Sequence, residues 1–477
     1  MKTLMPHLGY WLKKLGLHRG SPRLWFETNR LGSAGLLPGS RFDVVALEHG
    51  IKLVPNAHGQ YGVCSKERNG RQLPVIDINS REVLAPLGEQ QVVRVVVRLD
   101  GIFVLRVASE QAKAERIERL RTKLATGERL ASASIAHGAG VLSNVAHAGF
   151  KDAGIELDMK MLCEIDAAYV EQSLNCNPVS ANATPLCAPI QELVQDEWLM
   201  RQVPRVEVLE MGLPCSGASR AGKSKRGLSM MEDHPEVGHL IYAALALIQK
   251  LQPAAIVLEN VEDYRASASA QILRSQLRDM GYQVREHVLR ARDFGSLENR
   301  VRWALVATTD GLPAVESVSP QGSEPGITLR ALLDDVDADA PCWSSMEYLK
   351  SKEARDMADG KGFAMQLVDA NSTSVPTIRK AYNKGGSTDP FVRHPTDSRL
   401  MRKLTPAEHA RIKGVPEALI SGMSATAAHE VLGQGVVCAP FRALFQELAE
   451  CFKRLRDHGP VWIGECTCAH RLTGAIG

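Results

Sequence analysis

Four groups of residues that could do chemistry each stand beside a short apolar run of the sequence. In chain order they are Gly138 and Gly140, Glu164 and Asp166, Pro214 and Cys215, and Glu259 and Asn260. Glycines let a backbone approach a ligand closely, and a carboxylate after a strand can accept hydrogen bonds from ribose hydroxyls. A cysteine on a loop can act as a nucleophile when its thiolate is favoured, and a partly desolvated glutamate can carry a proton. The set therefore indicates a nucleotide-type cofactor beside a reactive thiol.

The apolar runs predict the elements that position these groups. Residues 161–163, 206–211, 254–258 and 303–307 are short continuous apolar segments, which is typical of buried strands. Apolar residues between 237 and 251 recur at helical spacing. Alternating strands and helices predict an α/β fold, a largely parallel sheet with helices on both faces. Because ligands bind beyond the carboxyl ends of such strands, we expect the four groups to converge on one edge.

The rest of the chain has other sequence patterns. Residues 41–55 and 92–107 each read as a β-hairpin, with turns at His49-Gly50 and Asp100-Gly101, and together they form a weak internal repeat. Residues 109–129 are charged and helix-prone. Residues 310–400 are rich in Gly, Ser, Asp and Pro without a strong period, and 404–455 return to helices.

Composition sets broad limits. The chain has 477 residues, 44% hydrophobic and 23% charged, with a net charge of +3, so we expect two or three domains of an ordinary globular protein. The apolar runs are too short to span a membrane. Ten scattered cysteines in a chain of this size favour reduced thiols and a cytoplasmic location.

The order of the motifs over residues 131–455 resembles the DNA cytosine C5-methyltransferases. The matching segments are Pro214–Ser219 (PCSGAS), Glu259–Val261 (ENV), Arg300 and Arg302 of an Arg-x-Arg pair, Leu404–Glu408 (LTPAE) and Gly433–Val436 (GQGV). The resemblance implies a Rossmann-like sheet that binds S-adenosylmethionine, the methyl donor, and double-stranded DNA as the substrate.

The family's mechanism can be transferred residue by residue. The resemblance implies that Cys215 attacks C6 of a cytosine flipped out of the duplex, since a stacked base hides its ring faces. Glu259 would hydrogen-bond the Watson–Crick edge and help protonate N3, and Arg300 and Arg302 would steady the base. The residues implied for the cofactor are Gly138, Gly140, Glu164, Asp166, Pro214, Asn260 and Gly433. Those expected at DNA are Ser219, Lys223, Lys225, Arg226, Arg379 and Lys384, with Lys380 and Arg393 as further candidates.

The sequence departs from the family pattern at four places. Ala136 stands where an aromatic residue is usual in the cofactor motif, and Glu298 replaces the Gln common before the Arg-x-Arg pair. Gln434 stands where Asn is expected, and the acidic residue expected near Ala188-Pro189-Ile190 is missing, with Glu192 as a substitute.

The resulting domain partition has six parts. A small β-rich domain (1–110) precedes a helical linker (111–130), the catalytic core (131–309), a target-recognition region (310–400), a return to the core (401–455) and a tail (456–477). The first resembles swapped-hairpin domains of the AbrB type, which implies DNA binding or dimerisation. Cys466, Cys468 and His470 lack a fourth ligand, so no metal site is predicted.

Three functions remain open at this level. The first is DNA methylation in a restriction-modification or phage-type system, with a cognate restriction endonuclease as a possible partner. The second is a degenerate homologue that binds DNA without turnover, and the third is methylation of cytosine in RNA. The recognition sequence and the oligomeric state do not follow from the sequence, because no code links an irregular loop region to bases.

Overall fold

A computed structural model of the chain describes residues 9–88, 91–214, 230–320 and 327–461. The chain divides into two compact units. The smaller comprises the chain up to Glu115 together with Arg278–Gly281, and the larger comprises Arg116–Leu277 and Tyr282–Val461. The boundary falls inside helix α2 (Ala108–Thr126), in the segment for which the sequence predicts a helical linker.

The larger unit is built on a seven-stranded sheet in the order β13-β12-β11-β14-β15-β17-β16. The strands are β11 (Leu130–Ile135), β12 (Leu157–Glu164), β13 (Thr184–Cys187), β14 (Val208–Met211), β15 (Ala255–Asn260), β16 (Tyr282–Arg290) and β17 (Val301–Thr309). Strands β11 to β15 pair in parallel, whereas β17 runs antiparallel to both of its neighbours. This arrangement confirms the predicted α/β sheet.

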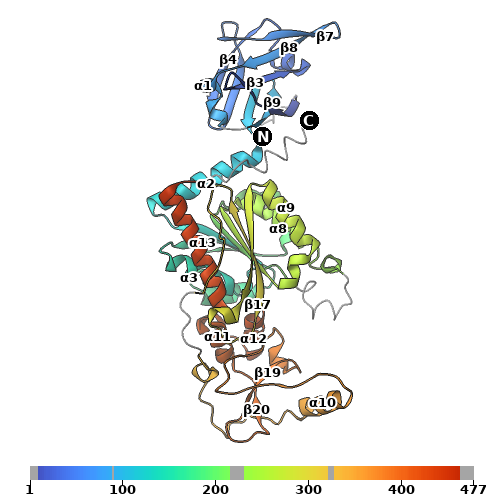
Figure 1. The fold of residues 1–477 in the computed structure, drawn as a ribbon, viewed down its shortest axis with the longest axis vertical. Coiled ribbons are helices and arrows are strands. Elements are labelled where there is room, and N and C mark those ends of the chain that lie inside the picture. The colour runs from blue at the N-terminus through green and yellow to red at the C-terminus, as the bar shows by residue number, and fades with distance from the viewer. Residues whose placement is uncertain (1–8, 89–90, 215–229, 321–326, 462–477) are drawn as a thin grey trace. The chain divides into compact units, whose positions relative to one another are not determined.

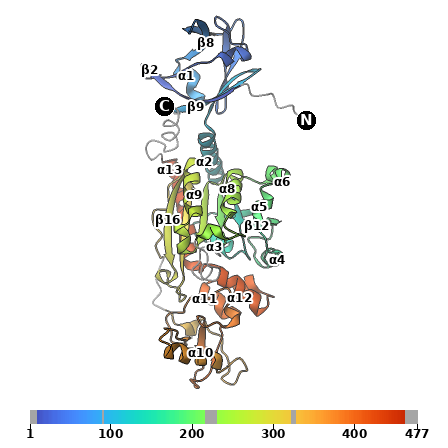
Figure 2. The ribbon, with the colours of Figure 1, turned by 90° about the vertical axis from the view of Figure 1, so that its right-hand side faces the viewer.

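Helices cover both faces of this sheet. Figures 1 and 2 show α3 and α13 on one face and α8 and α9 on the other. The helices that follow the core strands are α3 (Val141–Asp152), α4 (Ala167–Cys176), α5 (Ile190–Leu193), α6 (Glu197–Gln202), α8 (Leu240–Leu251), α9 (Ala268–Asp279) and α13 (Cys438–His458). The α3–α13 layer is held by aromatic packing of Phe150 against Phe445 and Phe452, with ring centroids 6.5 and 5.5 Å apart.

The chain order creates a switch point between β11 and β14. After β11 the chain adds β12 and β13 on one side, then crosses to β14 and β15 on the other. In open sheets of this kind, ligands bind beyond the carboxyl ends of the strands where the order reverses. The glycine turn after β11 and the Pro214 segment after β14 both stand at this point.

A smaller layer follows β17. It contains η6 (Leu329–Ala331), α10 (Glu347–Ala358), β18 (Gln366–Val368), η7 (Tyr382–Lys384), β19 (Pro390–Arg393), β20 (Met401–Arg402), α11 (Pro406–Lys413), η8 (Glu417–Ile420) and α12 (Ala425–Gln434). Strands β18, β19 and β20 form a three-stranded sheet that the sequence, lacking a clear period over 310–400, does not predict. The short 3-10 helices η3 (Met231–Asp233), η4 (Glu262–Ala266) and η5 (Ala291–Phe294) lie in earlier loops.

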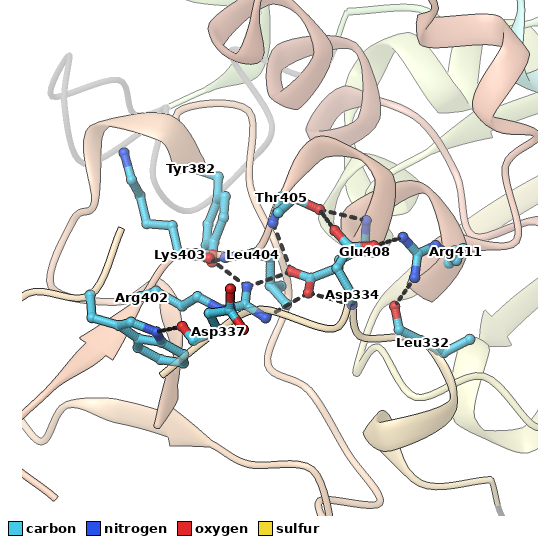
Figure 3. A network of polar contacts seen from close by, with 11 residues as sticks. Leu332, Asp334, Asp337, Tyr382, Arg402, Lys403, Leu404, Thr405, Glu408 and Arg411 are labelled. Atoms are coloured by element: carbon cyan, nitrogen blue, oxygen red, sulfur yellow. Dashed lines mark hydrogen bonds and ion pairs between the residues drawn. The ribbon is translucent and has the colours of Figure 1, made fainter. Parts of the chain in front are cut away.

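The LTPAE motif forms the start of helix α11 and is held by a network of polar contacts (Figure 3). Thr405 caps the helix by accepting the Glu408 amide at 3.1 Å, and the Thr405 amide donates to the Glu408 carboxylate at 2.8 Å, which makes a reciprocal capping box. The buried Glu408 carboxylate also binds the Arg402 guanidinium through two contacts of 2.7 Å. Arg411 donates to the Leu332 carbonyl at 2.6 Å and pairs with Asp334. The contacts of the motif therefore hold the start of α11 against the segments around Leu332 and Arg402.

The smaller unit is an all-β fold with its own apolar core. A six-stranded sheet has the order β1-β9-β10-β5-β4-β6, and a four-stranded sheet has the order β2-β3-β8-β7. The elements are β1 (Gly9–Lys14), β2 (Gly16–His18), β3 (Ser21–Glu27), η1 (Asn29–Ala34), β4 (Arg41–Leu47), β5 (Gly50–Pro55), β6 (Tyr61–Gly62), β7 (Cys64–Arg68), β8 (Arg71–Ile78), α1 (Arg81–Leu84), η2 (Ala85–Leu87), β9 (Val92–Arg98) and β10 (Gly101–Arg106).

Both predicted hairpins are present in the smaller unit, as β4–β5 and β9–β10. They lie side by side, because β5 pairs with β10. Among the helices of the described ranges, none is both long enough and apolar enough for a membrane crossing.

Candidate active site

The glycine turn after β11 is tightly constrained on one side and open on the other. Gly138 and Gly140 have φ of +58° and +81°, which favours glycine. A Cβ on Gly140 would lie 2.5 Å from the Asn177 amide nitrogen, whereas a Cβ on Gly138 would meet nothing within 4 Å. Ala136 also has a positive φ of +54°, a conformation that costs energy outside glycine. The turn thus leaves free space in front of Gly138.

Glu164, at the end of β12, faces this turn. Its Oε2 accepts the Gly138 amide at 2.7 Å, and its Oε1 accepts the amides of Ile165 and Asp166 at 2.8 and 3.1 Å. Ile165 is 66% exposed beside it. An anchored acceptor, an open backbone and an uncovered apolar side chain suit a nucleoside, so the residues present fit an adenosyl cofactor. Asp166 instead caps α4 through the amides of Ala168 and Tyr169.

A buried polar network lies beneath the turn. His137 places Nδ1 2.8 Å from Ser134 Oγ and 3.0 Å from Ser143 Oγ, and its Nε2 lies 2.7 Å from Ser173 Oγ. The Ser143 hydroxyl in turn donates to the Glu210 carboxylate on β14. Burial raises the pKa of Glu210 to about 7, although hydrogen bonds from Ser134 and Ser143 oppose the shift. Burial likewise lowers the pKa of His137 to about 4.

The carboxyl ends of β14 and β15 lie close to the same turn. A Cβ on Gly212 would lie 3.5 Å from the Ala136 carbonyl oxygen and 3.9 Å from Glu259 Oε2. The buried Asn260 side chain donates to the Leu213 carbonyl at 3.0 Å, which fixes the segment that enters Pro214. Asn260 therefore holds the backbone before Cys215. Cys215 itself lies outside the described residues.

Glu259 forms an ion pair with Arg302. The Arg302 Nε lies 2.8 Å from Glu259 Oε1, and both side chains are mostly buried. They come from neighbouring strands, because β15 and β17 pair antiparallel. The pair orients the Glu259 carboxylate, and its second oxygen is the one on the Gly212 side.

Arg300 has a different setting from Arg302. Its guanidinium is buried and donates to the Gly433 carbonyl at 2.9 Å and to the Ile378 carbonyl at 3.4 Å. Gly433 is required at this crossing, because a Cβ there would lie 2.4 Å from the Arg379 carbonyl carbon. Arg300 and Gly433 thus tie the end of the insert to α12.

Glu298 joins the same buried cluster. Its carboxylate pairs with Lys413 Nζ at 2.7 Å, lies 3.5 Å from Arg300 and accepts the Ile378 amide at 3.0 Å. Burial lowers the pKa of Lys413 to about 7, and Arg300 lowers it further while Glu298 opposes the shift. Burial tends to raise the pKa of Glu298, but Lys413 and Arg300 lower it below its ordinary value. The charge introduced by Glu298 in place of Gln is therefore balanced inside the protein.

Residues 181–450 match the family model described as C-5 cytosine-specific DNA methylase, which is more than half of the chain. The chain belongs to this family. It is a DNA cytosine C5-methyltransferase that uses S-adenosylmethionine. The match begins at residue 181, so the N-terminal part of the smaller unit, up to Glu115, lies outside the family region.

Known relatives of the methylase are bacterial type II enzymes. The chain is 29% identical to M.NlaX of Neisseria lactamica over 54% of this chain and 80% of the relative. It is 26% identical to M1.ScrFI of Lactococcus lactis subsp. cremoris, over 53% of this chain and 65% of the relative. The structure of S. pombe Dnmt2 methyltransferase matches with a TM-score of 0.53 at 17% identity, covering 69% of this chain and 99% of that one, which shows a shared fold.

The candidate DNA-contacting residues of the methylase divide into two sets. Arg379 pairs with the buried Asp389 at 2.9 Å, so its guanidinium already braces the end of the insert. Lys384 ends η7 and is exposed. Lys380 and Arg393 are exposed. Four further candidates, Ser219, Lys223, Lys225 and Arg226, lie outside the described residues, as do Cys466, Cys468 and His470.

Three residues of the methylase escape prediction from sequence. The structure identifies Ile165 by the exposure of its apolar side chain, and it identifies Glu210 and Lys413 by the burial of their charged groups. Glu210 sits among apolar residues of a core strand, and a carboxylate there is the one signal that could have drawn attention to it. Lys413 reads as an ordinary last-turn cation of a helix.

The methylase should show a pH-dependent stability that traces to Glu210. Because its folded pKa is raised to about 7 from 4.5, the folded state holds a proton between these values that the unfolded state has released. Stability from this group is therefore lost as pH rises through that window. Glu210→Gln should gain roughly 3 kcal/mol relative to the natural enzyme between pH 4.5 and pH 8. Urea unfolding across this range measures it, with the exposed Glu197→Gln as control. A difference that does not change with pH would contradict the assignment.

Breaking the Glu298–Lys413 pair should cost stability in a non-additive way. Glu298→Gln leaves a buried ammonium without its carboxylate, and Lys413→Met leaves the reverse, so each should cost about 3–5 kcal/mol. The double variant should cost much less than the two singles together, because both charges are gone. Chemical unfolding of the four proteins closes the cycle. Additive losses would mean that the two charges do not interact.

Proposed function

We propose that the methylase acts on cytosine in a specific sequence of double-stranded DNA, through a covalent bond between Cys215 and C6 of a flipped base. The observation that carries this proposal is the convergence of the glycine turn, Glu164, Gly212 and Glu259 at the switch point of the sheet. The residues proposed for the methyl donor and those proposed for the cytosine therefore lie next to each other. The names of the bacterial relatives favour a restriction-modification setting, with a cognate endonuclease as a partner to be sought.

The cofactor supplies the methyl group when bound. Gly138 leaves room for the cofactor, and the Glu164 carboxylate offers a hydrogen-bond acceptor for its ribose. Ala136 stands where an aromatic ring is usual, and the exposed Ile165 side chain provides an apolar surface instead. Its exposed side chain lies directly after the Glu164 carboxylate. Stacking lost at one position of the turn is thus supplied from the next strand end.

The protein groups divide the base chemistry between them. The Cys215 thiolate adds to C6 while the Glu259 carboxyl hydrogen-bonds the base edge and helps to protonate N3, so that electrons move to C5. C5 takes the methyl group, a base removes the C5 proton, and elimination breaks the S–C6 bond. Arg302 holds Glu259 at 2.8 Å in the required position, and Asn260 holds the backbone that carries Cys215.

One assay tests the proposal against its rivals. Methyl label from S-adenosylmethionine should enter unmodified genomic DNA and should be found at C5 of cytosine. Transfer of label to tRNA in place of DNA would overturn the choice of DNA. No label in either, beside intact DNA binding, would indicate a degenerate homologue. A duplex with fluorine at C5 of the target cytosine should trap the covalent complex, since elimination then lacks its proton.

A further inference from the structure

The smaller unit carries an excess of positive charge that the larger unit does not share. Residues 1–115 contain 16 Lys and Arg and 10 Asp and Glu, a net charge of +6. The whole chain has a net charge of +3, so the remaining residues carry −3. An accessory unit that is basic beside an acidic remainder is typical of proteins that bind a polyanion.

This charge gathers on one face of the four-stranded sheet. Cross-strand partners place Lys66 opposite Leu73 and Arg68 opposite Arg71. Because side chains alternate across a strand, these three cations share a face with residues of β3, whose Trp25 pairs with Asp77 and whose Glu27 pairs with Val75. The basic face is defined by Lys13, Arg23, Trp25, Glu27, Lys66, Arg68, Arg71 and Asp77.

Direct contacts confirm that these side chains lie together. The ammonium groups of Lys13 and Lys66 lie 5.4 and 5.3 Å from the centroid of Trp25. Lys66 and Arg68 also reach Glu27, at 3.3 and 3.2 Å. The opposite side of the sheet is occupied by buried apolar residues such as Leu24 and Ile76. The basic face therefore points away from the core.

The internal carboxylates do not balance this face. The face has five cations but only two carboxylates, Glu27 and Asp77. Asp77 already accepts a hydrogen bond from Arg23 at 2.7 Å. Arg68 and Arg71 are cross-strand neighbours of like charge, which is unfavourable without a counter-ion. Within the described ranges Arg71 has no ion pair, and the Arg68 side chain is 66% exposed. An external polyanion would supply the missing negative charge.

We propose that the basic face binds the phosphate backbone of duplex DNA without reading its sequence, as a second DNA contact of the methylase. Regularly spaced phosphates complement a row of exposed cations, and Trp25 holds two of the lysines in place through cation–π contacts. The binding needs neither the cofactor nor turnover, so its test stands apart from the covalent mechanism proposed above.

The test compares two charge-matched variants of the full chain. Arg68→Gln/Arg71→Gln removes two cations of the basic face. Lys14→Gln/Arg30→Gln removes two exposed cations of the same unit that do not belong to the set defining the face; Lys14 alternates with Lys13 on β1, and Arg30 lies on η1. Binding of a labelled duplex without a target site is followed by fluorescence anisotropy between about 50 and 200 mM salt.

The face variant should bind about tenfold more weakly, with the slope of log K against log salt reduced by about 2, while the control stays close to the natural enzyme. Methyl transfer at saturating DNA should be unchanged in both. Equal DNA binding by the natural enzyme, the face variant and the control variant would overturn the proposal. The same three proteins are also measured with duplex RNA and with anionic vesicles, and a loss of binding seen only with one of these would overturn it too. A change of mass in solution that accompanies the loss would assign the face to dimerisation instead.

Discussion

A Cys215→Ser enzyme is expected to lose methyl transfer by about 10³-fold or more while keeping its affinity for DNA. A serine hydroxyl is a much weaker nucleophile than a thiolate at neutral pH, and C6 addition is the step on which all later steps depend. The backbone before the loop is held by Asn260 and by the end of β14, which the substitution does not touch. Labelled methyl transfer and anisotropy with a target duplex measure the two quantities separately.

The matched control is Cys64→Ser, which changes an exposed thiol on β7 of the smaller unit. Its activity should equal that of the natural enzyme. A Cys215→Ser enzyme with full activity would refute the role of the thiol. Equal losses in both variants would point to a general sensitivity to cysteine replacement. Trapping on the fluorinated duplex should also fail for Cys215→Ser alone.

Glu259→Gln should lower the rate of methyl transfer by about 10²–10⁴-fold, the range for removal of a positioned acid–base group. The amide keeps the shape of the side chain and a hydrogen bond to the base edge, but it cannot deliver the proton to N3. Folding should change less, because Arg302 keeps access to an amide oxygen in place of the carboxylate at 2.8 Å. Single-turnover kinetics on a target duplex isolates this step from product release.

The control for this change is Glu316→Gln, a carboxylate that pairs with Arg285 at 2.8 Å away from the site. It removes an arginine–carboxylate pair without touching the base pocket, and its rate should stay unchanged. A Glu259→Gln enzyme that differs only in DNA affinity would show that the carboxylate binds the base without transferring a proton.

Two features of the site follow from local sequence. Short apolar runs followed by polar residues predicted the strands, because the sheet is buried on both faces and its loops are not. Glu164 and Glu259 could be placed at strand ends for that reason, and the structure puts both near the glycine turn. The capping box at Thr405 and Glu408 is likewise local, since its partners lie within one turn of helix.

Roles that depend on distant contacts could not be read in this way. The family resemblance implied that Arg300 and Arg302 together steady the flipped base, and in the structure Arg300 contacts Gly433 and Ile378 whereas Arg302 contacts Glu259. Two residues two positions apart on one strand would share a face, but β17 begins at Val301, so Arg300 lies before the strand and only Arg302 takes its direction from it. Asn260 and Gly433, assigned to the cofactor from their motifs, likewise contact backbone of other segments.

The sequence by itself determined the family, the α/β sheet and the order in which its chemical groups occur, because these depend on periodicity and on motifs along the chain. Only the tertiary structure decided that Lys413 neutralises Glu298, that Glu210 lies beneath the glycine turn, and that cations of four strands form one face of the smaller unit. Burial and pairing join residues far apart in sequence, and these contacts set which charges are balanced and which remain open to a ligand.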